Sequence, residues 1–367
     1  MSVFMIVLCL RDPCCCACWV SLPLILYRLR GVPQMAEAAE VAKVPEAPEA
    51  PEVAEVTKVA EVAPTKCCDP KITTFYEAGA VVGKGGIWDP ETENYYYTDI
   101  TGMTIHILHV PTQKRKDYKL DTQVGSMALI EGGEGLVLAF EDGFAKWNFS
   151  EEKFTVLATP YGVNSGWRMN DGACDSKGRF WAGRLFKTDE SKPGEIYRLE
   201  TDGKTATKVI DDICCTNGLL WSPDNKLLYC GDSTLKKIFV WDYDEESGTP
   251  SNRRLFLDTA SLFDGVPDGA NIDKEGYLWV CFFDGNKLVR ISPDAKPVCT
   301  IDMPVKRPTQ PAWYGENLDE FLVTSASLGV DMNEWPLSGH IFHLKPGAQG
   351  QLKAKYHCEK TLPEKLP

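Results

Sequence analysis

Four dipeptides along the chain pair a polar residue with glycine, and three of them carry a side-chain oxygen that suits the binding of a cation. The four are Lys84-Gly85, Asp171-Gly172, Asn217-Gly218 and Asp268-Gly269. The amide oxygen of Asn217 and the carboxylate of Asp268 are ligands that hard divalent cations prefer. Asn-Gly and Asp-Gly are also common turn dipeptides, so one pair alone predicts only a turn. Four pairs at matching places in separate repeats favour side chains that converge on one point.

Each dipeptide precedes one copy of a recurring phrase in which turn residues lead into a short apolar run. The six copies are Asp89–Ile100, Glu131–Gly143, Asp175–Leu185, Ser222–Ser233, Asp273–Gly285 and Gly315–Ser327. In the fifth copy Gly276 relaxes the turn, and Leu278, Trp279 and Val280 suit a pleated, enclosed strand. The turns begin about 40 to 50 residues apart, which is typical of four-stranded propeller blades.

The six repeats predict an all-β fold, a six-bladed β-propeller over residues 72–367 with about 49 residues per blade. The first strand, expected at Ile72–Ala80, completes the last blade beside His340–Pro346. Closing the ring hides sheet edges that an open array would expose. A β-sandwich, the alternative, would need fewer and less regular repeats. Because the innermost strands of a propeller surround a central channel, we expect the polar residues of the four dipeptides to meet there.

The residues before the repeats differ in character. Residues 1–34 form an apolar, cysteine-rich leader that lacks the basic start of a signal peptide. Arg11, Asp12 and Pro13 interrupt it too early for a transmembrane helix, which needs about 20 mostly apolar residues. The second candidate start, Met35, would remove this leader, and its status is left open. Residues 35–71 are rich in Ala, Pro and Glu and predict a disordered acidic tail.

Composition excludes some classes of partner. The 367-residue chain has a net charge of −13, which argues against nucleic acid because phosphate binding needs a cationic face. Its 14 cysteines do not space out as a disulfide framework. Five cysteines lie in or beside apolar runs of the body, and we expect them to be reduced and buried: Cys174, Cys214, Cys215, Cys230 and Cys281. We therefore expect a cytoplasmic protein without firm membrane association. The alternative is membrane attachment, for example by palmitoylation, or secretion through residues 1–30. Nothing indicates the oligomeric state.

Three segments that carry these motifs resemble the senescence marker protein/gluconolactonase/luciferin-regenerating-enzyme family, that is, regucalcin-like proteins. They are RMNDGACDSKGRFWAG (Arg168–Gly183), TNGLLWSPDNKLLYCGDS (Thr216–Ser233) and VPDGANIDKEGYLWV (Val266–Val280). The resemblance runs from about Ile72 to His343. It implies a six-bladed propeller with one divalent metal, Ca, Zn or Mn, on its axis. It further implies calcium binding and a hydrolase that opens sugar lactones or similar small lactones.

The resemblance also assigns roles to individual residues. It implies that Asn217 and Asp268 ligate the metal, and that Arg168, Asn170 and Glu190 contact the substrate. The metal would polarise the lactone carbonyl. Asp268 would take the proton of the attacking water, unless the metal alone lowers the pKa of that water. The substrate would be a small-molecule lactone.

One position departs from the family pattern. The family's third metal ligand is the glutamate of a Gly-Glu-Gly-Pro-x-Trp motif, and Lys84 replaces it in GKGGIW (Gly83–Trp88). At an effective dielectric constant of 20, two unit charges about 4 Å apart interact by about 4 kcal/mol, and a dication doubles this. Either Lys84 bends away and water fills the gap, or its ammonium takes the place of the metal and pairs with Asp268. A diverged propeller that binds a small ligand without metal, or without turnover, is therefore the alternative to the metal-dependent lactonase.

Overall fold

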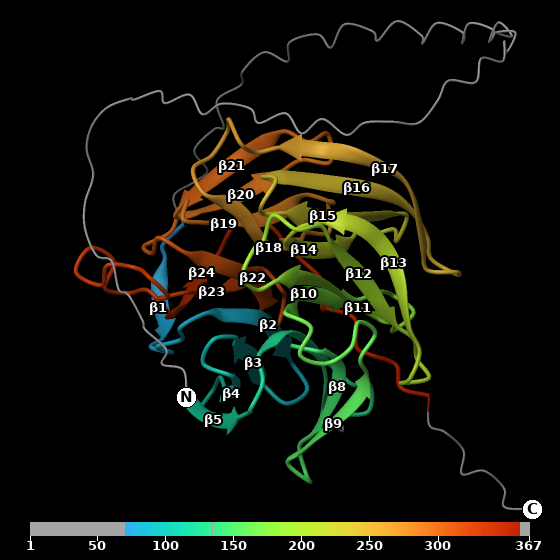
Figure 1. Ribbon diagram of the computed structural model, residues 1–367. Coiled ribbons are helices and arrows are strands. Elements are labelled where there is room, and N and C mark those ends of the chain that lie inside the picture. Colours follow the sequence, from blue (N-terminus) through green and yellow to red (C-terminus); the bar gives the residue numbers. More distant parts are fainter. Residues whose placement is uncertain (1–69, 134, 360–367) are drawn as a thin grey trace, which may run out of the picture. The chain divides into compact units, whose positions relative to one another are not determined.

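Residues 70–133 and 135–359 are described by the computed structural model, and within them the chain forms strands and no helix. Twenty-four strands build six four-stranded antiparallel sheets (Figure 1). This arrangement is a six-bladed β-propeller, which confirms the predicted fold class. The predictions for residues 1–34 and for the tail up to residue 69 lie outside the described residues. Among the described residues there is no helix of the length and apolarity that a membrane span requires.

Five blades are built from four consecutive strands each. Blade 1 contains β2 (Gly83–Asp89), β3 (Asn94–Asp99), β4 (Thr104–His109) and β5 (Lys114–Lys119). Blade 2 contains β6 (Val124–Leu129), β7 (Gly135–Phe140), β8 (Gly143–Asn148) and β9 (Lys153–Ala158). Blade 3 contains β10 (Trp167–Cys174), β11 (Phe180–Phe186), β12 (Gly194–Leu199) and β13 (Ala206–Ile213). Blade 4 contains β14 (Thr216–Trp221), β15 (Leu227–Asp232), β16 (Lys237–Asp244) and β17 (Thr249–Asp258). Blade 5 contains β18 (Val266–Ile272), β19 (Leu278–Phe283), β20 (Lys287–Ile291) and β21 (Pro297–Asp302).

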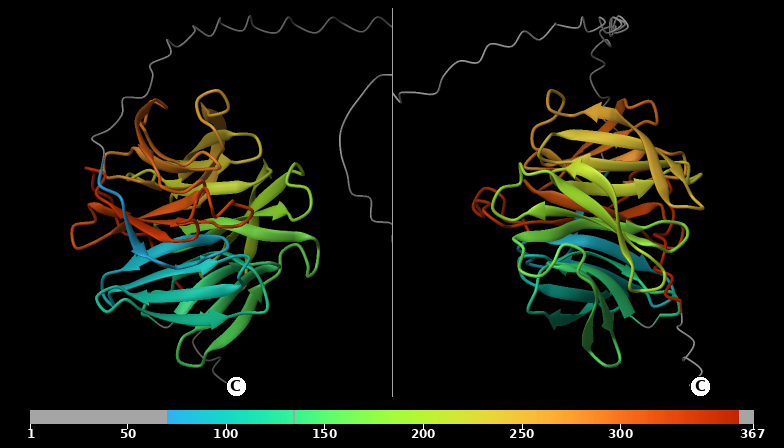
Figure 2. Two further views of the ribbon diagram at one scale, coloured as in Figure 1. Left: turned by 90° about the vertical axis from the view of Figure 1, so that its left-hand side faces the viewer. Right: turned by 45° about the vertical axis from the view of Figure 1, so that its right-hand side comes forward.

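Blade 6 joins the two ends of the propeller. It contains β22 (Pro308–Tyr314), β23 (Glu320–Ser325) and β24 (Ile341–Leu344), and β1 (Thr73–Tyr76) adds the outer strand. Strand β1 pairs antiparallel with β24, with Thr73 opposite His343. Figure 2 shows this blue strand beside the red strands near the end of the chain. The predicted completion of the last blade by the first strand is confirmed.

In the third and fifth copies of the recurring phrase, an aspartate joins the turn to the strand that follows. One carboxylate oxygen of Asp175 accepts hydrogen bonds from the backbone N–H groups of Lys177 and Arg179, both at 3.0 Å. Its other oxygen accepts the indole N–H of Trp181 at 2.9 Å. Asp273 repeats this pattern with the residues two, four and six positions after it. Each such aspartate thus satisfies turn amides and a buried tryptophan at once, which fixes the start of the second strand of its blade.

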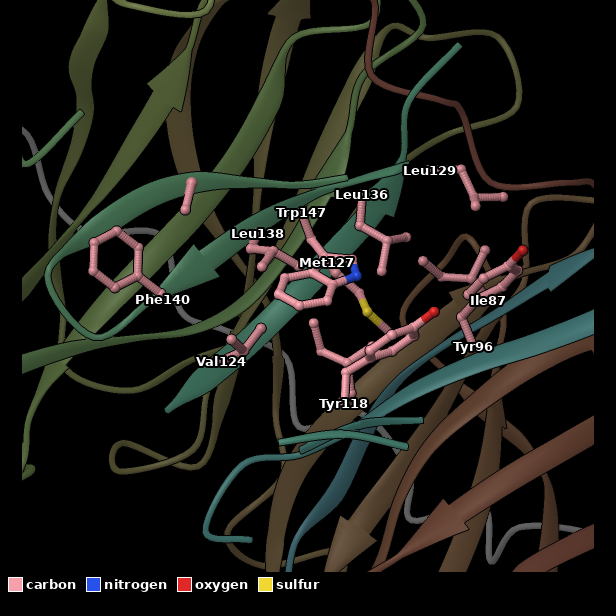
Figure 3. Close-up of a cluster of buried hydrophobic side chains, with 12 residues drawn as sticks. Ile87, Tyr96, Tyr118, Val124, Met127, Leu129, Leu136, Leu138, Phe140 and Trp147 are labelled. Carbon is pink, nitrogen blue, oxygen red and sulfur yellow. The ribbon is translucent and has the colours of Figure 1, made fainter. Parts of the chain in front are cut away.

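Apolar side chains fill the space between neighbouring blades. Between blades 1 and 2, Tyr96 and Tyr118 pack with Met127, Leu138 and Trp147, and all five are buried (Figure 3). Removing this apolar surface from water is the main force that holds the blades together. The packing also fixes the first strands of the blades, β2, β6, β10, β14, β18 and β22, each of which contacts the next around a closed ring.

Five cysteines of the body follow the sequence prediction, and one does not. The five predicted thiols are free and buried: Cys174, Cys214, Cys215, Cys230 and Cys281. Cys299 is disulfide-bonded, which its position in the sequence did not suggest.

Candidate functional site

Four of the six innermost strands carry the polar residues singled out in the sequence. In β2, β10, β14 and β18 the pairing with the neighbouring strand shifts register at the polar segment. The shifts fall between Lys84 and Ile87, Met169 and Gly172, Asn217 and Leu220, and Pro267 and Ala270. An irregularity of this kind bends a strand and redirects its side chains. The glycines after Lys84 and Asn217 have positive φ, a backbone conformation that lets the strand make this bend.

Lys84, Asn217 and Asp268 meet at one point, although they lie in three different blades. The Lys84 ammonium donates hydrogen bonds to Asn217 Oδ1, at 2.5 Å, and to Asp268 Oδ1. All three residues are buried, with Lys84 only 3% exposed. The predicted convergence of these three residues is confirmed. The side chain of Lys84 does not bend away; its ammonium stands between the two oxygens.

The charges at this point stabilise one another. Burial by itself lowers the pKa of Lys84, but the carboxylates of Asp268 and Asp171 outweigh burial, so the pKa lies above its ordinary value. Burial raises the pKa of Asp268, and the neighbouring ammonium limits that rise. Lys84 is therefore a charged ammonium at neutral pH, and its pairing with Asp268 is a buried ion pair.

Asn217 is held by neighbours on both of its polar atoms. Its Oδ1 also accepts from Asn170 Nδ2 at 3.2 Å, and its Nδ2 donates to Ser233 Oγ at 2.7 Å. Asn170 Nδ2 donates in addition to the backbone oxygen of Thr216 at 2.9 Å, and Ser233 Oγ donates to that of Pro267 at 2.6 Å. Ser233 thus links blades 4 and 5 beside the site.

Arg168 and Glu190 flank this centre. Arg168 Nη1 donates to Asn170 Oδ1 at 2.8 Å and to the backbone oxygen of Met169 at 3.1 Å. Burial lowers the pKa of Arg168, and this guanidinium forms no ion pair within residues 70–133 and 135–359. Glu190 is exposed in the loop between β11 and β12, where its backbone oxygen accepts from Thr234 Oγ1 at 3.0 Å.

A single pocket of about 290 Å³ is lined by all six of these residues: Lys84, Arg168, Asn170, Glu190, Asn217 and Asp268. Asp171 does not line it, although its dipeptide matches the others. Its carboxylate instead accepts the backbone N–H groups of Gly172, at 2.9 Å, and Gly218, at 2.7 Å. The expectation that Asp171 occupies the same place as the other three is therefore wrong. A second pocket of about 260 Å³ lies at the opposite ends of β10, β14 and β18 and contains none of the six.

Two residues that support the site were not found from the sequence. Gln310 in β22 accepts the backbone N–H of Gly85 at 2.8 Å, which holds the segment that carries Lys84. Ser233 ends the fourth repeat phrase, and nothing in that phrase indicates a link to the next blade. Gln310 is followed by proline, so it lacks the pattern of a polar residue before glycine that marks the other four strands.

The donor set does not suit a divalent metal ion as it stands. Asn217 Oδ1 and Asp268 Oδ1 converge, but both accept hydrogen bonds from a cationic side chain at the point that an ion would need. Among the described residues, no group of three or more His, Cys, Asp or Glu side chains is placed to hold a metal. A dication at this point would face the Lys84 ammonium at contact distance, which Coulomb repulsion strongly disfavours.

Comparison with known proteins places this chain in a family. Residues 82–327 match the family model described as the SMP-30/Gluconolactonase/LRE-like region. Regucalcin of Xenopus laevis is 33% identical over 273 residues, which cover 72% of this chain and 90% of that protein. The 6-deoxy-6-sulfogluconolactonase of Pseudomonas putida is 30% identical over 275 residues, which cover 74% and 93%. The solved structure of a luciferin-regenerating enzyme superposes with a TM-score of 0.72 at 29% identity, over 78% of this chain and 99% of that one.

Proposed function

The chain belongs to the SMP-30/gluconolactonase/LRE-like family, and from this membership and the geometry of the pocket we propose that it hydrolyses a small lactone. The observation that carries the proposal is the convergence of Arg168, Asn170, Lys84 and Asp268 on one pocket. These groups supply hydrogen-bond donors for the oxygens of a sugar-like lactone and a carboxylate that can accept a proton. The volume of about 290 Å³ suits a single small molecule.

Asp268 is the group that we assign to proton transfer. Its contact with Lys84 uses Oδ1, and Oδ2 accepts no side-chain hydrogen bond within the described part of the chain. A water beside Oδ2 would give up a proton to it as the water oxygen bonds to the lactone carbonyl carbon. The ring C–O bond then breaks, and the proton passes from Asp268 to the ring oxygen that leaves. The product is the open-chain hydroxy acid.

Arg168 and Asn170 are assigned to substrate orientation. The hydrogen bonds of Arg168 Nη1 to Asn170 and to the backbone leave Nε and Nη2 as donors in a fixed planar fork. Such a fork suits paired oxygens, for example neighbouring hydroxyl groups or a carboxylate. Glu190, exposed at the rim of the pocket, would accept hydrogen bonds from hydroxyl groups of the same substrate.

Binding without turnover is the second candidate function. The position of Lys84 favours it, because the ammonium already satisfies the carboxylate that hydrolysis needs as a base. In that case the pocket would hold the same class of ligand and leave the lactone ring intact.

The two functions separate in one set of measurements on the full chain. Ring opening of five- and six-membered sugar lactones is followed by titration of the acid released, and binding of the same lactones is followed by calorimetry. We expect turnover above the buffer rate, and a loss of about 10²-fold or more in Asp268→Asn because a general base is removed. Glu246→Gln, an exposed site outside the pocket, is the matched control. Binding without turnover would overturn hydrolysis in favour of the second candidate. If the lactones are neither bound nor opened, both candidate functions are wrong.

A further inference from the structure

We propose that the Lys84 ammonium is the resident cation of this site, in the place where the family pattern predicts a divalent metal ion. The proposal rests on the proposed function, since it names the group that acts on the lactone carbonyl. It also makes a statement about metal binding that holds whether or not a lactone is turned over. The chain would then work without a metal in this pocket.

The geometry of the ammonium carries this inference. An ammonium has three N–H donors and accepts nothing. Two donors of Lys84 are used by Asn217 Oδ1 and Asp268 Oδ1, and within residues 70–133 and 135–359 no third acceptor contacts the nitrogen. Because Lys84 also lines the pocket, its third N–H is the donor left for a ligand. Strands β14 and β18 thus hold the ammonium carried by β2 in a fixed position in the lining of the pocket.

The surrounding charges match a cation of this kind. The carboxylate of Asp268 touches the ammonium, and the charge of the Asp171 carboxylate also attracts it. Asp171 is itself held by the backbone N–H groups of Gly172 and Gly218, so its position is fixed. The charge of Lys84 therefore balances acidic groups that would otherwise repel one another in a buried place. A carboxylate at position 84 would leave them unbalanced and in need of an added cation.

The chemistry follows from the third N–H. As water adds to a lactone, negative charge develops on the carbonyl oxygen, and a donor fixed beforehand stabilises that charge without reorganising. The ammonium supplies one full charge and a directed hydrogen bond, where a metal ion would supply two charges and a coordination bond. The step involves no oxidation or reduction, and the proton of the ammonium stays on nitrogen throughout.

The test compares the metal response of the wild-type full chain with that of Lys84→Glu and Lys84→Met. Each protein is melted with EDTA and with Ca²⁺, Zn²⁺ or Mn²⁺. We expect no metal-dependent shift in wild type or Lys84→Met. In Lys84→Glu we expect a melting temperature lowered in EDTA and raised by several degrees as one metal saturates. Adding Asp268→Asn to Lys84→Glu should abolish that rise, which places the metal at this site.

Other outcomes would overturn the proposal. One is a metal-linked rise in the melting temperature of wild type that Asp268→Asn abolishes. Another is a loss of wild-type lactone turnover in EDTA that added metal restores. If Lys84→Glu does not fold, calorimetric titration of wild type decides: one tightly bound divalent ion per chain, lost in Asp268→Asn, contradicts the proposal, and no such ion supports it. A wild type that neither binds nor opens a lactone refutes the proposed function, and the metal measurements stay informative.

Discussion

Replacing Lys84 by methionine should destabilise the protein by an amount that depends on pH, because the change strands the Asp268 carboxylate in a buried place. Removing one partner of a buried ion pair typically costs about 3–5 kcal/mol. Asp268 can escape part of this cost by taking up a proton. At pH 7 that uptake costs at most about 4 kcal/mol, because this pH lies about three units above the ordinary pKa of an aspartate and each unit corresponds to about 1.4 kcal/mol. A loss of about 3–4 kcal/mol is therefore expected.

The sign of the pH dependence follows from burial. Without the ammonium, the folded-state pKa of Asp268 rises further above the unfolded value, because burial already raises it. The folded variant then binds the extra proton, so the difference from wild type shrinks as the pH falls from 7 toward 5, by up to about 1.4 kcal/mol per unit. Lys84 itself contributes stability that is present below its ordinary pKa of 10.5 and is lost as the pH rises through its higher folded-state value.

The assay is denaturant-induced unfolding of wild type and Lys84→Met at pH 5, 6 and 7. In a thermal melt, the loss at pH 7 corresponds to a decrease of about 6–10 °C for a chain of this size. Lys116→Met, which removes an exposed lysine paired with exposed Glu152, is the matched control and should change stability by under about 0.5 kcal/mol. A loss under about 1 kcal/mol, or one that is the same at all three pH values, would refute the buried ion pair.

Three further predictions concern other parts of the propeller. Asp175→Ala should cost about 3–5 kcal/mol in urea unfolding, since it leaves buried Arg179 and Trp181 N–H groups without their acceptor; a loss under about 1 kcal/mol would contradict the anchoring role. Burial raises the pKa of the Cys215 thiol to about 12, so alkylation at pH 8, read by peptide mass spectrometry, should be about 10³-fold slower than in urea, and equal rates would contradict it. Gly125→Ala should weaken lactone binding, because a Cβ there would lie 2.4 Å from the backbone oxygen of Asn170; unchanged affinity would show that the strand can move aside.

The architecture was predictable because each blade contains one copy of the same short turn-and-strand phrase. In two of these copies an aspartate binds its own turn and a tryptophan six residues on, so short-range sequence encodes the start of a strand pair there. The number of phrases equals the number of blades, and the strand that precedes the first phrase closes the ring. The meeting of Lys84, Asn217 and Asp268 followed in turn from equal places in separate blades.

What the sequence left open depends on distances of an ångström or two. Whether Lys84 bends away or pairs with Asp268 is decided by which oxygens lie within reach of a flexible side chain, which no spacing records. Asp171 shows the same limit, since its carboxylate turns to backbone N–H groups of β10 and β14 and leaves the pocket lining. Gln310 could not be predicted because it supports the site through a backbone amide and is followed by proline, not glycine.

The most direct measurement is a crystal structure of the full chain soaked in Mn²⁺, with anomalous scattering used to locate the metal. We predict no anomalous peak between Asn217 and Asp268, and clear density for the Lys84 ammonium bridging their two oxygens. A manganese peak about 2.0–2.5 Å from both oxygens, with Lys84 turned away from them, would contradict the account.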